Sequence, residues 1–178
     1  MAEGPRRVVD VRRILDLLAA LNEADVVYVV VGGVAVVLRG HVRTTVDLDL
    51  ALDLSADNLL PAMDVLRRQG LVPRLPVAAE QFADPAVRRA WVEERNLVAF
   101  TLHDPSDALR EVDLLATSPV PFDELLAGSG VVDVAGVPVR VASVAHLLRM
   151  KRAAGRPQDL ADVAALSQLA EGPSGGGP

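Results

Sequence analysis

The sequence predicts an α/β fold, in which helices pack against a β-sheet. Amphipathic helical patterns alternate along the chain with short β-branched runs, and turn residues join two pairs of these runs into hairpins. The chain has 178 residues, of which 51% are hydrophobic, and this is enough to fill one sizeable core. We therefore expect a single domain over residues 1–171, with a core over 24–142 and a C-terminal helical pair over 143–171. A disordered tail is expected over 172–178.

The first half of the chain alternates helices and strands. In the first segment apolar residues recur at helical period, with arginines on the other side. A continuous β-branched run then ends at a glycine pair, as expected of a buried strand. The predicted elements are a helix over 8–22, a strand over 26–31, a short helix over 33–39 that Gly40 ends, a strand containing Asp47 and Asp49, and a helix from the N-cap Ser55 to Arg68.

The second half begins with a less regular stretch, 71–95, that several prolines interrupt. Beyond it, polar turn residues separate two strand patterns, and Ala135-Gly136 joins two more. The predicted elements are a helix from Asp84-Pro85 through Trp91, strands over 97–102 and 110–115, a hairpin over 131–141, a helix capped by Ser143 through Ala154, and a last helix from Pro157 to near Glu171.

Composition excludes several classes of function. The chain has no cysteine, which rules out disulfides, thiol catalysis and cysteine-ligated zinc. Aromatic residues make up only 3%, so base-stacking platforms are not expected, and the net charge of −6 disfavours non-specific coating of nucleic acid. There is no apolar signal core and no run long enough to span a membrane. The sequence therefore predicts a cytoplasmic protein without a membrane partner.

The segment from Val26 to Leu50 carries the chemistry. Gly32 and Gly33 follow one apolar strand, and Asp47 and Asp49 lie on the next. Residues i and i+2 of a strand share a face, about 6–7 Å apart, so the two carboxylates are expected to point together and share a divalent cation. Magnesium prefers oxygen ligands and binds one or two carboxylates together with substrate phosphates. A glycine turn beside them suits those phosphates.

Two further residues extend this constellation. Asp113 alternates with Val112 and Leu114, so it points away from the core and offers a third carboxylate. Lys151 is the single lysine beside 17 arginines, which favours a site that needs a compact ammonium, although chance retention is an equally simple reading. Three carboxylates beside a glycine turn are the arrangement expected for metal-assisted nucleotidyl transfer.

These residues resemble the nucleotidyltransferase superfamily related to DNA polymerase beta, in particular its small bacterial AbiEii-like toxin branch. The branch has a strand, then G-G or G-S, then R-x-T-x-D-x-D; this chain has Gly32, Gly33, Arg43, Thr45, Asp47 and Asp49. The segment LLRMKRAAGRPQDLADVAAL resembles the branch's lysine helix and its K/R-x-x-D-x-x-D helix, here Lys151, Asp159 and Asp162. The resemblance spans Val26 to about Leu169.

The resemblance implies a mixed, twisted sheet and an enzyme that moves a nucleoside monophosphate from a triphosphate to an acceptor hydroxyl. It implies Mg²⁺ or Mn²⁺ at Asp47, Asp49 and Asp113, with Lys151 and Asp159 at the nucleotide. The acceptor stays open between a tRNA end, a protein hydroxyl and a small antibiotic, and a toxin role implies a cognate antitoxin. Many members have serine where this chain has Gly33, so the Gly33 backbone N–H would have to replace a hydroxyl contact.

Other readings stay open at this stage. Asp47 and Asp49 also fit the solvated face of an edge strand, where aspartates deter pairing, and Arg43 also fits a surface ion pair. D-x-D after an apolar run also suits a haloacid-dehalogenase-like phosphatase, whose first aspartate is the nucleophile, but the glycine pair has no role there. A third reading is a nucleotide-binding or regulatory module without catalysis on the same fold.

Overall fold

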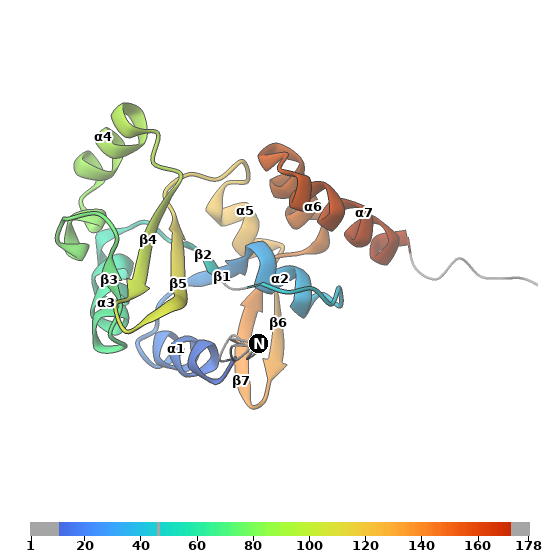
Figure 1. Cartoon of the computed structure of the whole chain (residues 1–178), viewed down its shortest axis with the longest axis horizontal. Coiled ribbons are helices and arrows are strands. Elements are labelled where there is room, and N and C mark those ends of the chain that lie inside the picture. Colours follow the sequence, from blue (N-terminus) through green and yellow to red (C-terminus); the bar gives the residue numbers. More distant parts are fainter. Residues whose placement is uncertain (1–10, 46, 172–178) are drawn as a thin grey trace, which may run out of the picture.

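The computed structural model describes residues 11–45 and 47–171. Within these ranges, seven α-helices and one 3₁₀ helix alternate with seven strands (Figure 1). The helices are α1 (Val11–Glu23), α2 (Gly32–Leu38), α3 (Ala56–Arg68), η1 (Ala79–Ala83), α4 (Pro85–Arg95), α5 (Phe122–Ala127), α6 (Val144–Ala154) and α7 (Pro157–Glu171). The strands are β1 (Tyr28–Val31), β2 (Leu48–Leu52), β3 (Val72–Pro73), β4 (Ala99–Asp104), β5 (Asp107–Leu115), β6 (Gly130–Val134) and β7 (Val137–Val141).

The strands form one mixed sheet in the order β3-β4-β5-β2-β1-β7-β6. Its two hairpins, β4–β5 and β6–β7, are antiparallel, as is the central pair β1–β2. The pairs β1–β7 and β2–β5 are parallel. The predicted α/β fold with a mixed sheet and helices packed on it is therefore confirmed, and β2 is a central strand with neighbours on both sides.

The core is built mainly from valine, leucine and alanine, as the composition predicts. All four residues of β1 are buried, because helices cover both faces of the centre of the sheet. Three of the five aromatic side chains form one cluster, in which Phe100 of β4 stacks with Phe82 of η1 and Trp91 of α4. Figure 1 shows α6 and α7 together at one side of the sheet, beside α2.

Local signals in the sequence set some of the helix ends. Asp84 accepts hydrogen bonds from the first backbone N–H groups of α4, and Ser143 accepts one from His146 N–H at the start of α6. Gly155 adopts a left-handed conformation and ends α6, as predicted. Ser55 precedes α3 as predicted, but its side chain makes no capping bond.

Several boundaries differ from the predicted ones. The first strand begins at Tyr28 instead of residue 26, and the β4–β5 strands extend toward their shared turn. The irregular stretch after α3 holds a two-residue strand, β3, and the 3₁₀ turn η1 before α4. Residues 8–10 of the predicted first helix and the predicted disordered tail, 172–178, lie outside the described residues. No helix in the described ranges has the length and hydropathy needed to cross a bilayer.

Candidate active site

A glycine pair joins β1 directly to α2, and side-chain packing explains both glycines. Gly32 has a left-handed backbone, with φ of +62°, and a Cβ there would overlap the Asp49 carboxylate. A Cβ on Gly33 would overlap the Thr45 hydroxyl and the Arg43 guanidinium. Thr45 and Arg43 thus occupy the space into which a serine side chain at position 33 would extend.

Two of the predicted carboxylates lie side by side in the centre of the sheet. Asp49 on β2 is in register with Asp113 on the parallel strand β5, and on its other side Asp49 pairs with Val31, the residue before the glycine turn. Thr101 on β4 is in register with Asp113, and its hydroxyl donates a 2.5 Å hydrogen bond to Asp113 Oδ1. Sheet register therefore fixes both carboxylates next to the turn.

The position of Asp47 corrects one prediction. Asp47 was expected within the strand, but β2 begins at Leu48 and Asp47 is exposed just before it. The pairing with β1 ends at Asp49, where β1 turns into α2, and the pairing with β5 ends at Leu48, so Asp47 has no partner on either strand. Asp47 still lines the same cavity as Asp49 and Asp113.

The carboxylates interact electrostatically. Burial, the charge of Asp113 and, more weakly, that of Asp47 raise the pKa of Asp49 to about 6, although the Gly33 N–H donates to its carboxylate. Partial burial of the Asp47 carboxyl, with the charges of Glu111 and Asp113, raises its pKa as well. Like charges held this close favour binding of a cation, which would relieve the repulsion between them.

This donor set fits magnesium or manganese better than a metal that needs a preformed cage. Within residues 11–45 and 47–171, no three acidic or histidine side chains converge tightly enough to hold a metal ion by themselves. Magnesium usually keeps several waters and takes only one or two carboxylates together with substrate phosphates. Asp49 and Asp113, with Asp47 at the cavity wall, match that requirement.

Lys151 lies in a buried ion-pair network between α6 and α7. Its Nζ is 2.9 Å from Asp159 Oδ1 and 2.8 Å from Asp162 Oδ2, and both aspartates are only 1% exposed. Burial alone would raise the pKa of Asp159, but hydrogen bonds from Arg156 and Lys151 lower it overall. Lys151 and Asp159 were predicted to contact nucleotide; both line the carboxylate-bearing cavity, while bonded to each other.

Arg43 connects the loop before β2 to the same network. Its Nε is 3.1 Å from Asp162 Oδ1, and its guanidinium lies against Gly33. The alternative reading of Arg43 as an ion-pairing residue thus has support, although its partner, Asp162, is on the C-terminal helix α7 and not on the strand surface. Thr45 lies beside Arg43 on the cavity wall.

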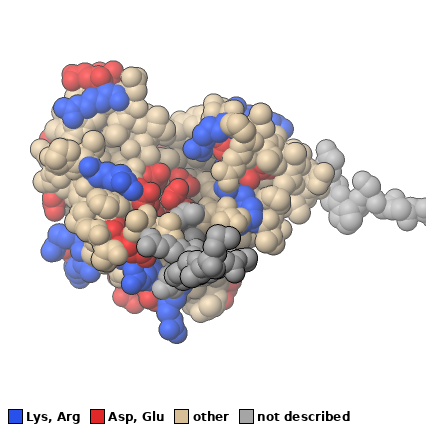
Figure 2. Space-filling view, in the orientation of Figure 1, with Lys and Arg blue, Asp and Glu red and all other residues tan. Residues whose placement is uncertain are grey.

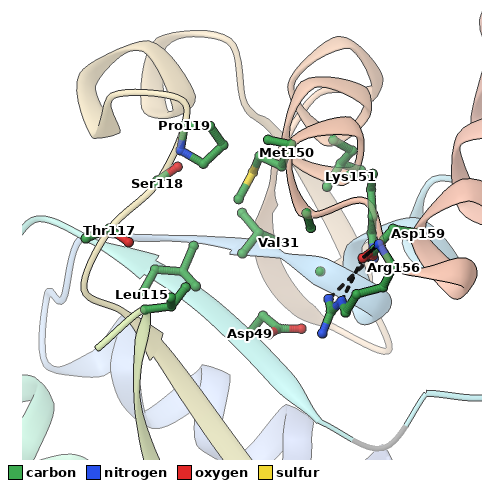
Figure 3. Close-up of a pocket in the computed structure, with 15 residues that line it drawn as sticks. Val31, Asp49, Leu115, Thr117, Ser118, Pro119, Met150, Lys151, Arg156 and Asp159 are labelled. Carbon is green, nitrogen blue, oxygen red and sulfur yellow. Dashed lines mark hydrogen bonds and ion pairs between the residues drawn. The ribbon is translucent and has the colours of Figure 1, made fainter. Parts of the chain in front are cut away.

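Arg156 is a site residue that the sequence analysis missed. Its side chain is 74% exposed and its Nε is 2.7 Å from Asp159 Oδ2. That hydrogen bond, and more weakly the charges of Asp49 and Asp113, raise the pKa of Arg156, because the guanidinium faces the carboxylates (Figure 3). The sequence did contain a signal for Arg156: it lies three residues before Asp159 and is the basic residue of the R-x-x-D-x-x-D motif.

Two cavities lie between the sheet and the C-terminal helices. The carboxylate cavity, about 590 Å³, is lined by Gly32, Gly33, Arg43–Thr45, Asp47, Asp49, Asp113, Lys151 and Arg156–Asp159. The apolar cavity, about 370 Å³, is lined by Val31, Gly32, Asp49, Val98, Leu115, Thr117–Pro119, Leu147, Met150, Lys151, Ala153, Ala154, Arg156 and Asp159. Both have the size of small-molecule sites, about 300–1,000 Å³. Figure 2 shows acidic side chains gathered in the hollow between the sheet and the C-terminal helices, with basic side chains around it.

The fold is similar to that of solved nucleotidyltransferases. The lincosamide antibiotic adenylyltransferase LnuA, solved with lincomycin bound, is 14% identical with a TM-score of 0.62 over 92% of this chain and 99% of that chain. ANT(2'')-Ia, solved with adenylyl-2''-tobramycin, is 16% identical with a TM-score of 0.58 over 91% and 89%. An antigenic nucleotidyltransferase-like protein from Paracoccidioides brasiliensis is 18% identical with a TM-score of 0.55 over 89% and 77%.

No protein-family model and no curated protein sequence matches the chain. Structural likeness at such low identity shows the fold alone, so the chain has a nucleotidyltransferase fold. The fold that the resemblance implies is confirmed, and the toxin-like branch stays a prediction.

Proposed function

We propose that this chain is a metal-dependent nucleotidyltransferase that moves a nucleoside monophosphate from a triphosphate to an acceptor hydroxyl. The observation that carries the proposal is the register of Asp49 with Asp113, beside a glycine turn whose first residue allows the Asp49 carboxylate to lie against it. Fold comparisons with adenylyltransferases support the reaction class. The polar, carboxylate-lined cavity beside the turn has room for a triphosphate.

Each part of the cavity has a role in this proposal. Gly32 and Gly33 form the wall of the carboxylate cavity at the β1–α2 turn, where the triphosphate would lie. Arg156, whose side chain is exposed although its Nε bonds to Asp159, provides positive charge for the phosphates, because Lys151 is buried between two aspartates. Asp113, held by the Thr101 hydroxyl, accepts the proton of the attacking hydroxyl.

Asp47, Asp49 and Asp113 would hold Mg²⁺ or Mn²⁺ when it is bound, and the cation would neutralise charge on the phosphates. In the reaction the acceptor oxygen forms a bond to the α-phosphorus, the bond from that phosphorus to the β-bridging oxygen breaks, and pyrophosphate leaves. Arg43 and Thr45 form the cavity wall at the pyrophosphate end.

The finer sequence predictions belong to this proposal as well. A place in the AbiEii-like toxin branch, with a cognate antitoxin and a tRNA or protein acceptor, is supported by the R-x-T-x-D-x-D motif and the R-x-x-D-x-x-D helix. The fold comparisons give these points no support, since LnuA was solved with lincomycin and ANT(2'')-Ia with adenylyl-2''-tobramycin.

The test is a transfer assay with matched carboxylate variants. Purified protein is incubated with each labelled triphosphate, magnesium and cell extract, and the labelled product and pyrophosphate are measured. We expect one acceptor to become labelled, and Asp49→Asn or Asp113→Asn to lower the rate about 100-fold or more. Asp53→Asn, a carboxylate outside both cavities, serves as the control. Absence of triphosphate binding with magnesium in calorimetry would overturn the proposal.

One observation favours the non-catalytic alternative: the Lys151 charge is balanced by two buried aspartates, which leaves fewer free cations for a transition state. That reading predicts tight triphosphate binding without pyrophosphate release. The phosphatase alternative has no support in the fold comparisons, and it predicts a phosphoaspartate on Asp47, which mass spectrometry of trapped protein would reveal.

A further inference from the structure

The apolar cavity is a second compartment next to the carboxylate cavity. Its walls are formed by the ends of the central strands, the 117–119 segment and α6 (Figure 3). Val98, Leu115, Pro119, Leu147 and Met150 make most of the surface. Such a surface gains free energy by covering apolar groups of a ligand and gives nothing to a charged one.

Charged groups of the apolar cavity are confined to one side. Asp49, Lys151, Arg156 and Asp159 all lie along the seam with the carboxylate cavity, and both cavities share them. Of the two carboxylates, Asp159 is already bonded to Lys151 and Arg156, so a polycationic ligand would find few partners. Away from the seam, the polar side chains among the described lining residues are the hydroxyls of Thr117 and Ser118.

The apolar cavity is also a poor site for a nucleic-acid end. Bound single strands usually stack bases on aromatic rings and hold phosphates with basic side chains. None of the described residues that line this cavity is aromatic, and its cations, Lys151 and Arg156, lie on the seam. RNA therefore has neither a stacking surface nor a backbone track beyond the seam.

The relation of the two cavities to Asp49 indicates which substrate each one takes. In a nucleotidyl transfer the attacking and leaving oxygens lie roughly in line through the phosphorus. With pyrophosphate at the Gly33 and Thr45 end of the carboxylate cavity, the attacking hydroxyl arrives from the opposite side of Asp49. The apolar cavity, which Asp49 lines but Gly33 and Thr45 do not, is the compartment available to that hydroxyl.

We propose that the apolar cavity binds the acceptor, and that the acceptor is a small, uncharged, mainly apolar molecule that carries a hydroxyl group. This inference rests on the proposed function and deepens it by naming the substrate class. The hydroxyl lies at the seam, where its oxygen bonds to the α-phosphorus, its proton passes to Asp113 and pyrophosphate leaves. Thr117 and Ser118 offer hydrogen bonds to a single polar group of the acceptor, and the apolar wall covers the rest of the molecule.

Binding can be tested without turnover through the methionine methyl groups. The chain has three methionines; Met150 lines the apolar cavity, and Met63 is 1% exposed in the core. In protein labelled with ¹³C-methyl methionine, the neutral alcohols geraniol and cyclohexanol are titrated in, with tobramycin as a polycation and adenosine as a nucleoside for comparison. We expect the alcohols to shift the Met150 resonance and leave Met63 unchanged.

Two variants fill the cavity from opposite walls. Ala154, exposed on the same α6 face as Leu147 and Met150, is changed to Phe, and Val98, 63% exposed, is changed to Phe in a second protein. Each should weaken alcohol binding about tenfold or more, as expected when a hydrophobic pocket loses room. Ala145→Phe, at an exposed alanine of the same helix outside both cavities, should leave it unchanged. An unshifted Met63 resonance shows that each variant has folded.

A transfer assay then separates the acceptor classes. The inference is supported if the protein, given triphosphate and magnesium, transfers label to a neutral hydroxyl compound and the Ala154→Phe variant does not. Saturation of the Met150 shift by adenosine alone, or label appearing in RNA or tobramycin, overturns it. If alcohols bind but no triphosphate does, the proposed function fails while the ligand class of the cavity stands; if pyrophosphate is released and no alcohol binds, this inference alone fails.

Discussion

At the scale of single residues, Gly32 packs directly against the Asp49 carboxylate. Asp49 is held beside Val31 by sheet register, so the next residue along the chain must pass against its carboxylate. Only a residue without a Cβ can do so, and the left-handed backbone at Gly32 adds a second demand for glycine. The glycine turn and the central carboxylate are therefore one structural unit.

Gly32→Ala should destabilise the protein more than a substitution at a glycine that has similar backbone strain but no steric overlap. Gly70 is the matched control, since its φ of +79° is also left-handed but a Cβ there meets no atom within 4 Å. We expect Gly70→Ala to cost about 1–2 kcal/mol of unfolding free energy, and Gly32→Ala to cost about 1–3 kcal/mol more from overpacking. Urea denaturation of the two variants measures the difference; equal losses would contradict the packing argument.

The raised pKa of Asp49 makes stability depend on pH. Because burial and the Asp113 charge raise the folded-state pKa to about 6, from 3.8 in the unfolded chain, the native state binds this proton more tightly. The contribution of Asp49 is thus fully present below about pH 4 and is lost as the pH rises through about 6. Asp49→Asn should remove this loss and stabilise the protein at pH 7–8 by on the order of 2 kcal/mol.

The measurement is the free energy of unfolding between pH 4 and 8 without divalent cations. The wild-type protein should lose stability relative to Asp49→Asn as the pH rises from 4 to 6. Asp53 follows the end of β2 and lines neither cavity, so Asp53→Asn should follow the wild-type curve. A wild-type curve parallel to that of Asp49→Asn would show that Asp49 ionises as an ordinary carboxyl.

At the scale of elements, α7 is joined to α6 and to the loop before β2 through buried charges. Lys151 bridges Asp159 and Asp162, and Arg43 reaches Asp162 from the loop. The compact ammonium of Lys151 bonds to both carboxylates from one atom, which suits the single lysine of an arginine-rich chain. The network sets where the C-terminal helices close both cavities.

Lys151→Met should therefore weaken the packing of α7 against α6 and lower the stability of the protein, whether or not it changes catalysis. Removing the lysine leaves two buried carboxylates without their cation, and breaking a buried pair costs about 3–5 kcal/mol. Arg152→Met is the control, because Arg152 is the exposed neighbour on α6. Hydrogen exchange of α7 amides and urea denaturation report the effect; a Lys151→Met protein as stable as Arg152→Met would show that the network contributes little.

At the scale of the whole molecule, both cavities are lined by residues of the sheet and of α6–α7, so a bound nucleotide would contact both parts. Its binding free energy then adds to the stability of the folded chain, since the unfolded chain has no such site.

Triphosphate with magnesium should raise the unfolding free energy, by about 2.7 kcal/mol at 100 times the Kd. The double variant Asp49→Asn/Asp113→Asn should lose most of this gain, whereas Asp53→Asn should keep it. Thermal unfolding with and without ligand measures both. A gain of the same size in the double variant would place the binding site away from these carboxylates.

Much of this architecture could be read from the sequence. Helix caps at Asp84, Ser143 and Gly155 act within a few residues, and strand periodicity at Asp113 is a local property, so these predictions are confirmed. Asp47 was misplaced because pairing with β1 ends at Asp49 and pairing with β5 ends at Leu48, and both ends are set by the neighbouring strands and not by the local sequence. Arg156 was missed because its position facing the carboxylates depends on how α7 packs.

The sequence by itself determined the order of helices and strands, the glycine turn and the identity of the acidic residues, because these follow from periodicity and side-chain chemistry within short segments. Only the tertiary structure decided that β2 is a central strand, that Asp49 faces Asp113 and that Lys151 lies between two aspartates. Those relations join residues far apart in the chain, and they arise from strand order and helix packing, which no local pattern encodes.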